Sequence, residues 1–328
     1  MSDNQKTAID ELSISTGPHV FTVTDTPRIM YGVIIALIPA SAMGIYLFGW
    51  GALKVIVISM LAAIITEGGV QRLMGREVSM LDGSAALTGL LLALNLPPSS
   101  PWWMVLVGAV IAITIGKQIY GGLGHNPFNP ALVARVVLLV SWPVQMTRWI
   151  APLSYPDSVS AATPLGILKA DGIAKLGGIR LFDLFIGNVG GCIGEVSAIA
   201  LLIGLLFLLW KGYVTWHIPI SYMGTVFVFT GIFWMAHPQK YANPLFHLLA
   251  GGLVLGSCFM ATDYVTSPMT PKGQIIFGIG CGLITCIIRL FGGYPEGVSF
   301  AILLMNAAAP LIDQYTRPKR YGRVKQNA

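Results

Sequence analysis

About ten apolar segments, separated by short polar stretches, constrain what this chain can fold into. They cover residues 29–48, 52–69, 84–96, 102–120, 130–142, 184–210, 216–235, 245–262, 274–291 and 298–315. A helix needs roughly 20 apolar residues to cross the hydrocarbon core of a bilayer. Hydrophobic residues make up 55% of the chain and charged residues only 10%, which is too apolar for an ordinary soluble domain. The sequence therefore predicts an all-α, polytopic membrane protein with about ten transmembrane helices.

The two halves of the chain repeat one pattern. Gly83-Ser84 opens a short apolar run that ends in a Pro/Ser cluster, and Gly256-Ser257 opens another. A full apolar segment and then a glycine pair follow in each half. Five segments per repeat is an odd number, so we expect two inverted repeats, a pattern that points to a binding site near the membrane midplane. Residues 83–101 and 256–271 are therefore expected to be buried, broken half-helices.

These features divide the chain into five parts. They are a cytoplasmic N-terminal segment (1–28), a first membrane repeat (29–142), an outward-facing loop (143–183), a second membrane repeat (184–315) and a basic cytoplasmic tail (316–328). Lys and Arg gather on the cytoplasmic side of membrane proteins, and they are more numerous on the side that would hold both termini. The N-terminal segment lacks the pattern of a cleaved signal peptide. We therefore expect both termini in the cytoplasm.

The charges and cysteines argue against two classes of function. The basic tail has few aromatic residues and no nucleic-acid-binding motif, so it marks the cytoplasmic side of the membrane rather than a nucleic-acid partner. The four cysteines lie in apolar runs without the spacing of metal ligands, and we expect them to be packing residues. The sequence leaves open a metal cluster whose ligands are shared with another subunit. These cysteines are Cys192, Cys258, Cys281 and Cys286.

A short polar island in the long loop carries a chemical signal. Residues 157–163 read Asp-Ser-Val-Ser-Ala-Ala-Thr, which is similar to the flavinylation signature Asp-x-x-Ser/Thr-Gly-Ala-Thr, with alanine in place of its glycine. In that signature an FMN transferase attaches FMN through its phosphate to the threonine, here Thr163, and would read Asp157 and Ser160. Pro164 favours an extended backbone at Thr163, which an external active site can grip. An ordinary loop threonine in an Asx-type turn is the alternative interpretation.

A glycine-rich segment, 187–197, is a second candidate for flavin binding. Gly190 and Gly191 would let the backbone approach a ligand, and a helix beginning here would direct N–H groups at an anion such as a flavin phosphodiester. Close packing of helices through small residues is the alternative interpretation. Glu195 lies in the same apolar run and therefore needs a partner or solvent.

Two asparagines precede the fifth apolar segment. The amide groups of Asn126 and Asn129 could read the edge of a flavin ring. Asn129 is also a suitable N-cap for a helix whose first residue is Pro130. The capping role and ligand binding are compatible with each other.

Charged residues inside apolar segments are functional candidates because charge is costly in a bilayer. They are Glu67, Lys117, Asp263 and Arg289. Asp263 follows a half-helix, where its carboxylate and free carbonyl groups could hold a cation such as Na+. Lys117 and Arg289 occupy equivalent places near the ends of matching helices, so we expect both to snorkel to the membrane interface.

Several of these motifs together resemble those of one family. The chain is similar to the D subunit of the Rnf electron transport complex, in the NqrB/RnfD family, and more distantly to the B subunit of the sodium-translocating NADH:quinone reductase. The resemblance covers residues 28–313. It rests on Asn-Pro-Phe-Asn-Pro-Ala-Leu-Val-Ala-Arg at 126–135, Gly-Cys-Ile-Gly-Glu at 191–195, Ala-Thr-Asp at 261–263 and Pro-Glu-Gly at 295–297.

The resemblance implies a flavoprotein subunit of an enzyme, an ion-translocating ferredoxin:NAD oxidoreductase, that is not active alone. It places the chain in the cytoplasmic (inner) membrane of a bacterium or archaeon, with Thr163 on the outer face. Electrons would pass through covalent FMN on Thr163, coupled to Na+ or H+ translocation. The partners would be the other Rnf subunits, including an outward-facing flavoprotein subunit, the FMN transferase and membrane lipid. The quinone-reductase relative also holds riboflavin, and a second, non-covalent flavin here stays open.

Two other classes of function fit the span pattern. A small-solute channel or secondary transporter with inverted repeats and no redox cofactor is the main alternative, since half-helices are common in such proteins. A purely structural membrane subunit is the third interpretation. Bound flavin would distinguish the flavoprotein interpretation from the channel or transporter and from the structural subunit.

Overall fold

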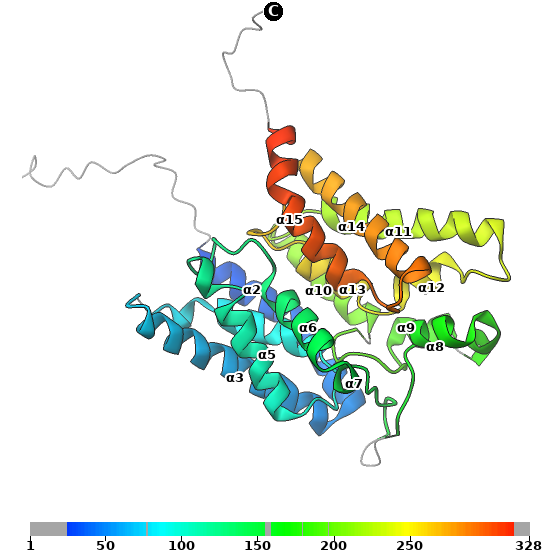
Figure 1. Ribbon diagram of the computed structural model, residues 1–328, viewed down its shortest axis with the longest axis horizontal. Coiled ribbons are helices and arrows are strands. Elements are labelled where there is room, and N and C mark those ends of the chain that lie inside the picture. Colours follow the sequence, from blue (N-terminus) through cyan, green and yellow to red (C-terminus); the bar gives the residue numbers. More distant parts are fainter. Residues whose placement is uncertain (1–24, 77, 155–158, 179, 196, 318–328) are drawn as a thin grey trace, which may run out of the picture.

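The computed structural model is built from helices. It describes residues 25–76, 78–154, 159–178, 180–195 and 197–317, and no strand longer than an isolated bridge occurs among them. The helices of the first half of the chain (blue to cyan-green) lie beside those of the second half (yellow to red), as Figure 1 shows.

Nearly all of the expected apolar segments are single helices. Six helical segments in the described part of the chain are long and apolar enough to cross a membrane. The helices of these segments are α2 (Thr26–Phe48), α3 (Trp50–Leu73), α5 (Trp102–Thr114), α11 (His217–Ala236), α14 (Pro271–Phe291) and α15 (Val298–Thr316). Three shorter apolar helices are α4 (Ser84–Leu94), α6 (Pro130–Ser141) and α10 (Ala198–Trp210). The expectation of an all-α polytopic protein is confirmed.

The eighth expected segment is broken. It consists of α12 (Pro244–Leu249), α13 (Leu253–Leu255) and the π-helical turn η4 (Gly256–Met260). All of α13 and η4 is buried, as is most of its counterpart α4. Irregular backbone inside a membrane requires this, because only surrounding protein or a cavity can satisfy its polar groups.

Asparagine or threonine followed by proline starts four of the helices. Asn129, Thr163, Asn243 and Thr270 are N-caps whose side-chain oxygens accept hydrogen bonds from backbone N–H groups one turn on. Each is followed by a proline, whose fixed φ suits the first helical position and whose missing N–H group would have had no partner there. The capping role expected for Asn129 is confirmed, with its Oδ1 3.1 Å from the Ala131 nitrogen.

Equivalent helices pack in the same way in the two halves. α3 packs on α5 and α5 on α6 in the first half, and α11 packs on α14 and α14 on α15 in the second. The halves meet where α2 lies against α10 and α6 against α15. Gly204 lets α10 approach α2 closely, because a Cβ atom there would collide with the carbonyl oxygen of Ala36.

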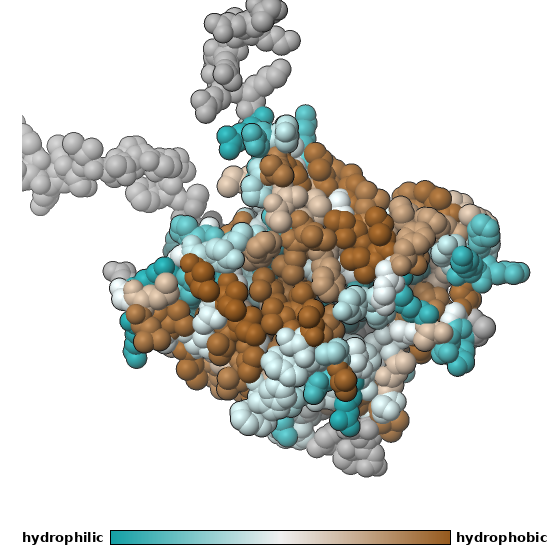
Figure 2. Space-filling view, in the orientation of Figure 1, coloured by the Kyte–Doolittle hydropathy of each residue, from teal (hydrophilic) through white to brown (hydrophobic). Residues whose placement is uncertain are grey.

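The outer surface of the helices is apolar. Figure 2 shows hydrophobic side chains over both halves of the molecule, with hydrophilic residues towards its margins. Large apolar side chains point outward from several long helices, including Ile35, Leu61, Ile65, Ile232, Ile287 and Leu304. A surface of this composition suits contact with lipid.

The glycine-rich segment and the long loop differ from expectation. The sixth apolar segment was expected to be helical from residue 184, but α10 begins only at Ala198, with the Ser197 hydroxyl as its cap. Glycine has a low helix propensity, which explains why residues 187–195 form a loop. The expected loop 143–183 contains α7 (Pro143–Met146), α8 (Pro164–Asp171), η3 (Ile173–Gly178) and part of α9 (Leu181–Ile186).

The expectation that Lys117 and Arg289 snorkel was wrong, because both side chains are buried. Lys117 Nζ lies 2.5 Å from Glu67 Oε1 and donates to the Ser84 hydroxyl as well. Arg289 donates to the carbonyl oxygens of His247 and Ala250. Removing these two charged groups from water costs free energy, and the hydrogen bonds to their partners offset part of that cost. All four cysteines are buried, which agrees with their expected packing role.

We predict that Gly204→Ala destabilises the protein by roughly 1–3 kcal/mol, the usual cost of overpacking, because the new methyl group would separate α2 from α10. Thermal unfolding of the detergent-solubilised chain measures this. The control is Gly224→Ala on the exposed face of α11, where a Cβ atom meets nothing within 4 Å. Equal melting temperatures for the two variants would contradict this account of the helix contact.

Candidate functional site

Thr163 lies in a small cavity at the N-terminus of α8. Its Oγ1 accepts a hydrogen bond from the Gly166 N–H at 3.1 Å, and the residue is only 8% exposed. The cap explains locally why the helix starts here, because Pro164 occupies its first position. Thr163 is therefore a buried cap rather than an ordinary loop threonine.

The glycine-rich loop forms another part of the wall of this cavity. Gly190, Gly191 and Glu195 line it together with Thr163, so the structure joins four of the residues that the sequence singled out. A Cβ atom at Gly190 would lie 3.2 Å from the Ala161 Cβ, and only glycine allows this close contact without adjustment. No helix begins at these glycines, so the expected helix N-terminus is supplied by α8 instead.

Of the other two residues singled out in the polar island, the described one, Ser160, does not line the cavity. Asp157 lies outside the described residues. Ser160 is exposed, forms an isolated bridge with Ile150 and lines a different groove, beside Lys54 and Arg148. A position outside the Thr163 cavity is compatible with recognition by an external enzyme, and the roles of both residues stay predictions.

Next to the Thr163 cavity lies a buried charge cluster centred on Arg135 of α6. Its guanidinium donates to Glu195 Oε1 at 2.9 Å, to Glu296 Oε2 at 2.8 Å and to Asn95 Oδ1 at 2.6 Å. Two carboxylates thus face one cation, and Glu296 Oε1 is buried without a hydrogen-bond partner. Burial and the neighbouring Glu296 carboxylate raise the pKa of Glu195 to about 7, so this pair of carboxyl groups favours binding a proton or another cation.

Sequence reasoning missed Arg135, Glu296 and Asn95 as site residues. A usable signal was present, because an arginine inside the apolar segment 130–142 and a glutamate at 195 each need a partner of opposite charge. Their pairing still could not be read from the sequence, since it joins residues 60 positions apart.

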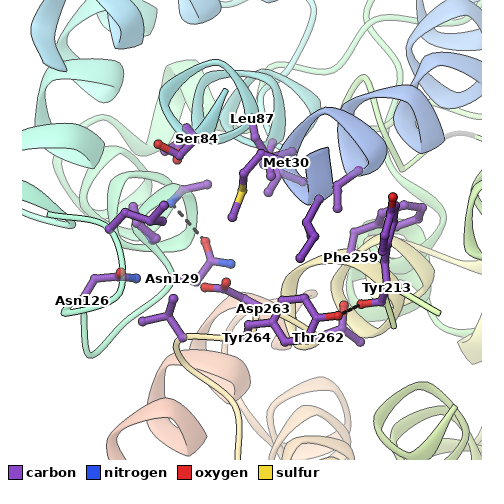
Figure 3. Close-up of a pocket in the computed structure, with 18 of the residues that line it drawn as sticks. Met30, Ser84, Leu87, Asn126, Asn129, Tyr213, Phe259, Thr262, Asp263 and Tyr264 are labelled. Carbon is purple, nitrogen blue, oxygen red and sulfur yellow. Dashed lines mark hydrogen bonds between the residues drawn. The ribbon is translucent and has the colours of Figure 1, made fainter. Parts of the chain in front are cut away.

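A second cavity contains the two asparagines. Its volume is about 80 Å³, and it is lined by Asn126, Asn129 and Asp263, with apolar and aromatic walls (Figure 3). The Asn126 Nδ2 donates to the Phe128 carbonyl, whereas its Oδ1 is buried without a partner. Largely apolar walls with a few converging polar groups are typical of a small-molecule site, but a drug-sized ligand needs roughly 300 Å³ or more, so its side chains would have to move apart to admit one.

The polar groups of this second cavity are held in place by the broken helix. Asn129 Nδ2 donates to the carbonyl oxygen of Met260, the last residue of η4, at 3.2 Å. Asp263 follows three residues later, and its Oδ2 accepts from the Thr266 hydroxyl. Among the described residues, no group of three His, Cys, Asp or Glu side chains could hold a metal ion. A cation site built from Asp263 and carbonyl oxygens stays a prediction.

Comparisons with known proteins agree on one family. The model of the NQR2, RnfD, RnfE family matches residues 13–322. The chain is 48% identical, over 96% of its own length and 96% of the relative, to the D subunit of the Na(+)-translocating ferredoxin:NAD(+) oxidoreductase complex of Acetobacterium woodii. It is also 48% identical, over 94% of its length and 96% of the relative, to the D subunit of the proton-translocating ferredoxin:NAD(+) oxidoreductase complex of Clostridium ljungdahlii. The D subunit of the ion-translocating oxidoreductase complex of Yersinia pseudotuberculosis is 40% identical over 95% of this chain and 98% of that relative.

We predict that Arg135→Gln destabilises the chain by about 3–5 kcal/mol, because it leaves the buried carboxylate of Glu195 and the half-buried carboxylate of Glu296 without their cation. Glu296→Gln is the matched control, since it removes one negative charge and leaves Arg135 paired with Glu195. Thermal unfolding in detergent compares the two. If Glu296→Gln were as destabilising as Arg135→Gln, charge balance would not be what holds this cluster together.

Proposed function

The chain belongs to the NQR2, RnfD, RnfE family of multi-pass membrane proteins, and from this premise we propose that it is the flavoprotein subunit of an ion-translocating ferredoxin:NAD oxidoreductase. Its relatives are named as the D subunits of such complexes. Under this proposal its partners are the other Rnf subunits, including an outward-facing flavoprotein subunit. The Thr163 loop would lie on the outer face of the cytoplasmic membrane, with both termini inside.

The observation that carries the proposal is the meeting of Thr163 with Gly190, Gly191 and Glu195 in one cavity. An FMN phosphate on Thr163 Oγ1 would stand at the N-terminus of α8, where backbone N–H groups favour an anion. The glycines leave the backbone open to a ligand in the cavity. The Thr163 hydroxyl, the start of α8 and the glycines fit the group, whereas Glu195 and Glu296 also line the cavity and would lie near its phosphate. Bound FMN would supply one- and two-electron transfer.

The burial of Thr163 has a consequence for maturation. A side chain that is 8% exposed is not accessible to the active site of a separate enzyme. An FMN transferase would therefore act before α8 packs onto the membrane helices, or during its temporary release.

The charge cluster offers a way to link electron transfer to cation uptake. Glu195 lines the Thr163 cavity and shares Arg135 with Glu296. Added negative charge in the cavity would raise the affinity of these carboxylates for a proton or another cation. Sequence identity does not indicate which ion is translocated, because the chain is equally similar to relatives named for Na+ and for protons.

The second cavity is our candidate for a non-covalent flavin such as riboflavin. Its apolar walls suit a flat ring system, and the unpaired Oδ1 of Asn126 is a buried acceptor that a ligand N–H group would satisfy. Asn129 is fixed by its cap and by Met260, so it would present a pre-oriented amide.

We predict that Thr163→Val removes covalently bound FMN, because it deletes the hydroxyl and keeps the side-chain shape. Flavin fluorescence of the denatured chain and its intact mass measure the label. The control is Thr147→Val, whose hydroxyl lies in the same loop and donates to the Pro143 carbonyl. Label that survives in Thr163→Val would refute the attachment site, and absence of flavin from the native chain would favour the channel alternative.

We also predict that Asn126→Leu lowers the amount of flavin released on denaturation while the covalent label is unchanged. Chromatography of the released flavin gives the ratio of flavin to protein. Asn188→Leu is the control, because this exposed asparagine lies outside the cavity. Equal release from the two variants would exclude Asn126 from flavin binding.

A further inference from the structure

A third cavity, beside α8, is lined by cations. Its volume is about 330 Å³, and it lies where α8 approaches the C-terminal end of α14 and the segment that follows α11. Lys169, Lys240 and Arg289 contribute to its wall, as does His247, whereas none of its lining residues is Asp or Glu. It is distinct from the Thr163 cavity, although Leu165 touches both.

Arg289 is the most unusual of these cations. The residue is 6% exposed, and no carboxylate lies within ion-pair distance of it in the described part of the chain. Its two terminal nitrogens donate to the carbonyl oxygens of His247 and Ala250, at the end of α12. Its Nε is buried without a partner. A buried cation that has only neutral partners remains costly unless an anion approaches it.

Two lysines, Lys169 and Lys240, add to this positive charge, and a neutral histidine lies beside them. Lys169 Nζ donates to the carbonyl oxygen of Tyr294 at 2.8 Å, and partial burial lowers the pKa of Lys169. An anion nearby would favour its charged form. His247 is 1% exposed, and neither ring nitrogen has a hydrogen-bond partner. The Lys240 ammonium lies 5.6 Å from the centre of the Tyr241 ring, at the rim of the cavity.

The apolar part of the wall indicates the kind of anion. Leu290 and Phe291 lie at the C-terminal end of the spanning helix α14, and Phe291 is 61% exposed. An end of a spanning helix is where lipid head groups meet acyl chains. Basic pockets between transmembrane helices bind anionic lipid head groups on the cytoplasmic side of membranes. The same charge-assisted hydrogen bonds between Lys or Arg and a phosphate can form at the other end of a spanning helix.

We propose that this cavity binds the phosphate group of an anionic phospholipid. The phosphate would lie among Lys169, Lys240 and Arg289, and the glycerol and the start of the acyl chains would lie along Phe291. A bound lipid would hold α8 against α14, because Lys169 belongs to the first and Arg289 to the second. The proposal does not depend on flavin attachment.

Native mass spectrometry of the full chain in detergent, titrated with phosphatidylglycerol, tests the proposal. We expect the double variant Lys169→Gln/Lys240→Gln to bind the lipid about ten-fold or more weakly, because each lysine contributes to attraction of the head group. The matched control is Lys211→Gln, which removes a lysine that also lies over an aromatic ring, that of Trp210, but outside the cavity. Equal affinity in the double variant and the control would overturn the proposal.

Two further arms identify the source of the phosphate. Inorganic phosphate is added at millimolar concentration, and we expect the lipid adduct to persist; loss of the adduct would assign the cavity to free phosphate. The titration is repeated with Thr163→Val, and we expect unchanged lipid affinity. Lipid binding seen only in that variant would mean that the flavin phosphate occupies the cavity, and would also overturn the proposal. If the double variant does not fold, Lys240→Glu alone replaces it, because Lys240 is exposed.

Discussion

Arg135 reaches from α6 to three segments that are far apart in the chain. It joins Asn95, which follows α4, Glu195 in the glycine-rich loop and Glu296 before α15. These three segments carry irregular backbone, which can lie inside a membrane protein only when other groups satisfy it. One guanidinium, with several donors in a fixed plane, orients all three at once. This cluster therefore holds together segments from both halves of the chain.

The same cluster lies between the two candidate flavin cavities. Glu195 lines the Thr163 cavity, and Arg135 links it to Asn95. The Asn95 amide contacts the Met260 sulfur at 3.5 Å, and the Met260 carbonyl accepts from Asn129, which lines the second cavity. A contiguous chain of polar contacts thus connects the cavities. Such a chain transmits a change in charge when its groups have two discrete arrangements.

Local patterns predicted a large part of the fold because each depends on neighbouring residues alone. The lengths of the apolar runs gave the spanning helices, and the Asn129-Pro130 pair gave the start of α6. Prediction failed where distant partners decide the outcome. Lys117 was expected at the interface, but Glu67 and Ser84 hold it in the interior. The sixth helix was extended too far because apolar character alone does not reveal how glycines weaken a helix.

The sequence by itself determined that the chain spans a membrane, that its halves repeat one pattern and that Thr163 lies in a recognisable motif, since these follow from composition and short-range order. Only the tertiary structure decided that Thr163 is buried in one cavity with Gly190 and Gly191, and that Glu195 shares Arg135 with Glu296. The physical reason is that an ion pair in an apolar interior is specified by three-dimensional proximity. A sequence shows that each buried charge needs a partner, but folding selects which one.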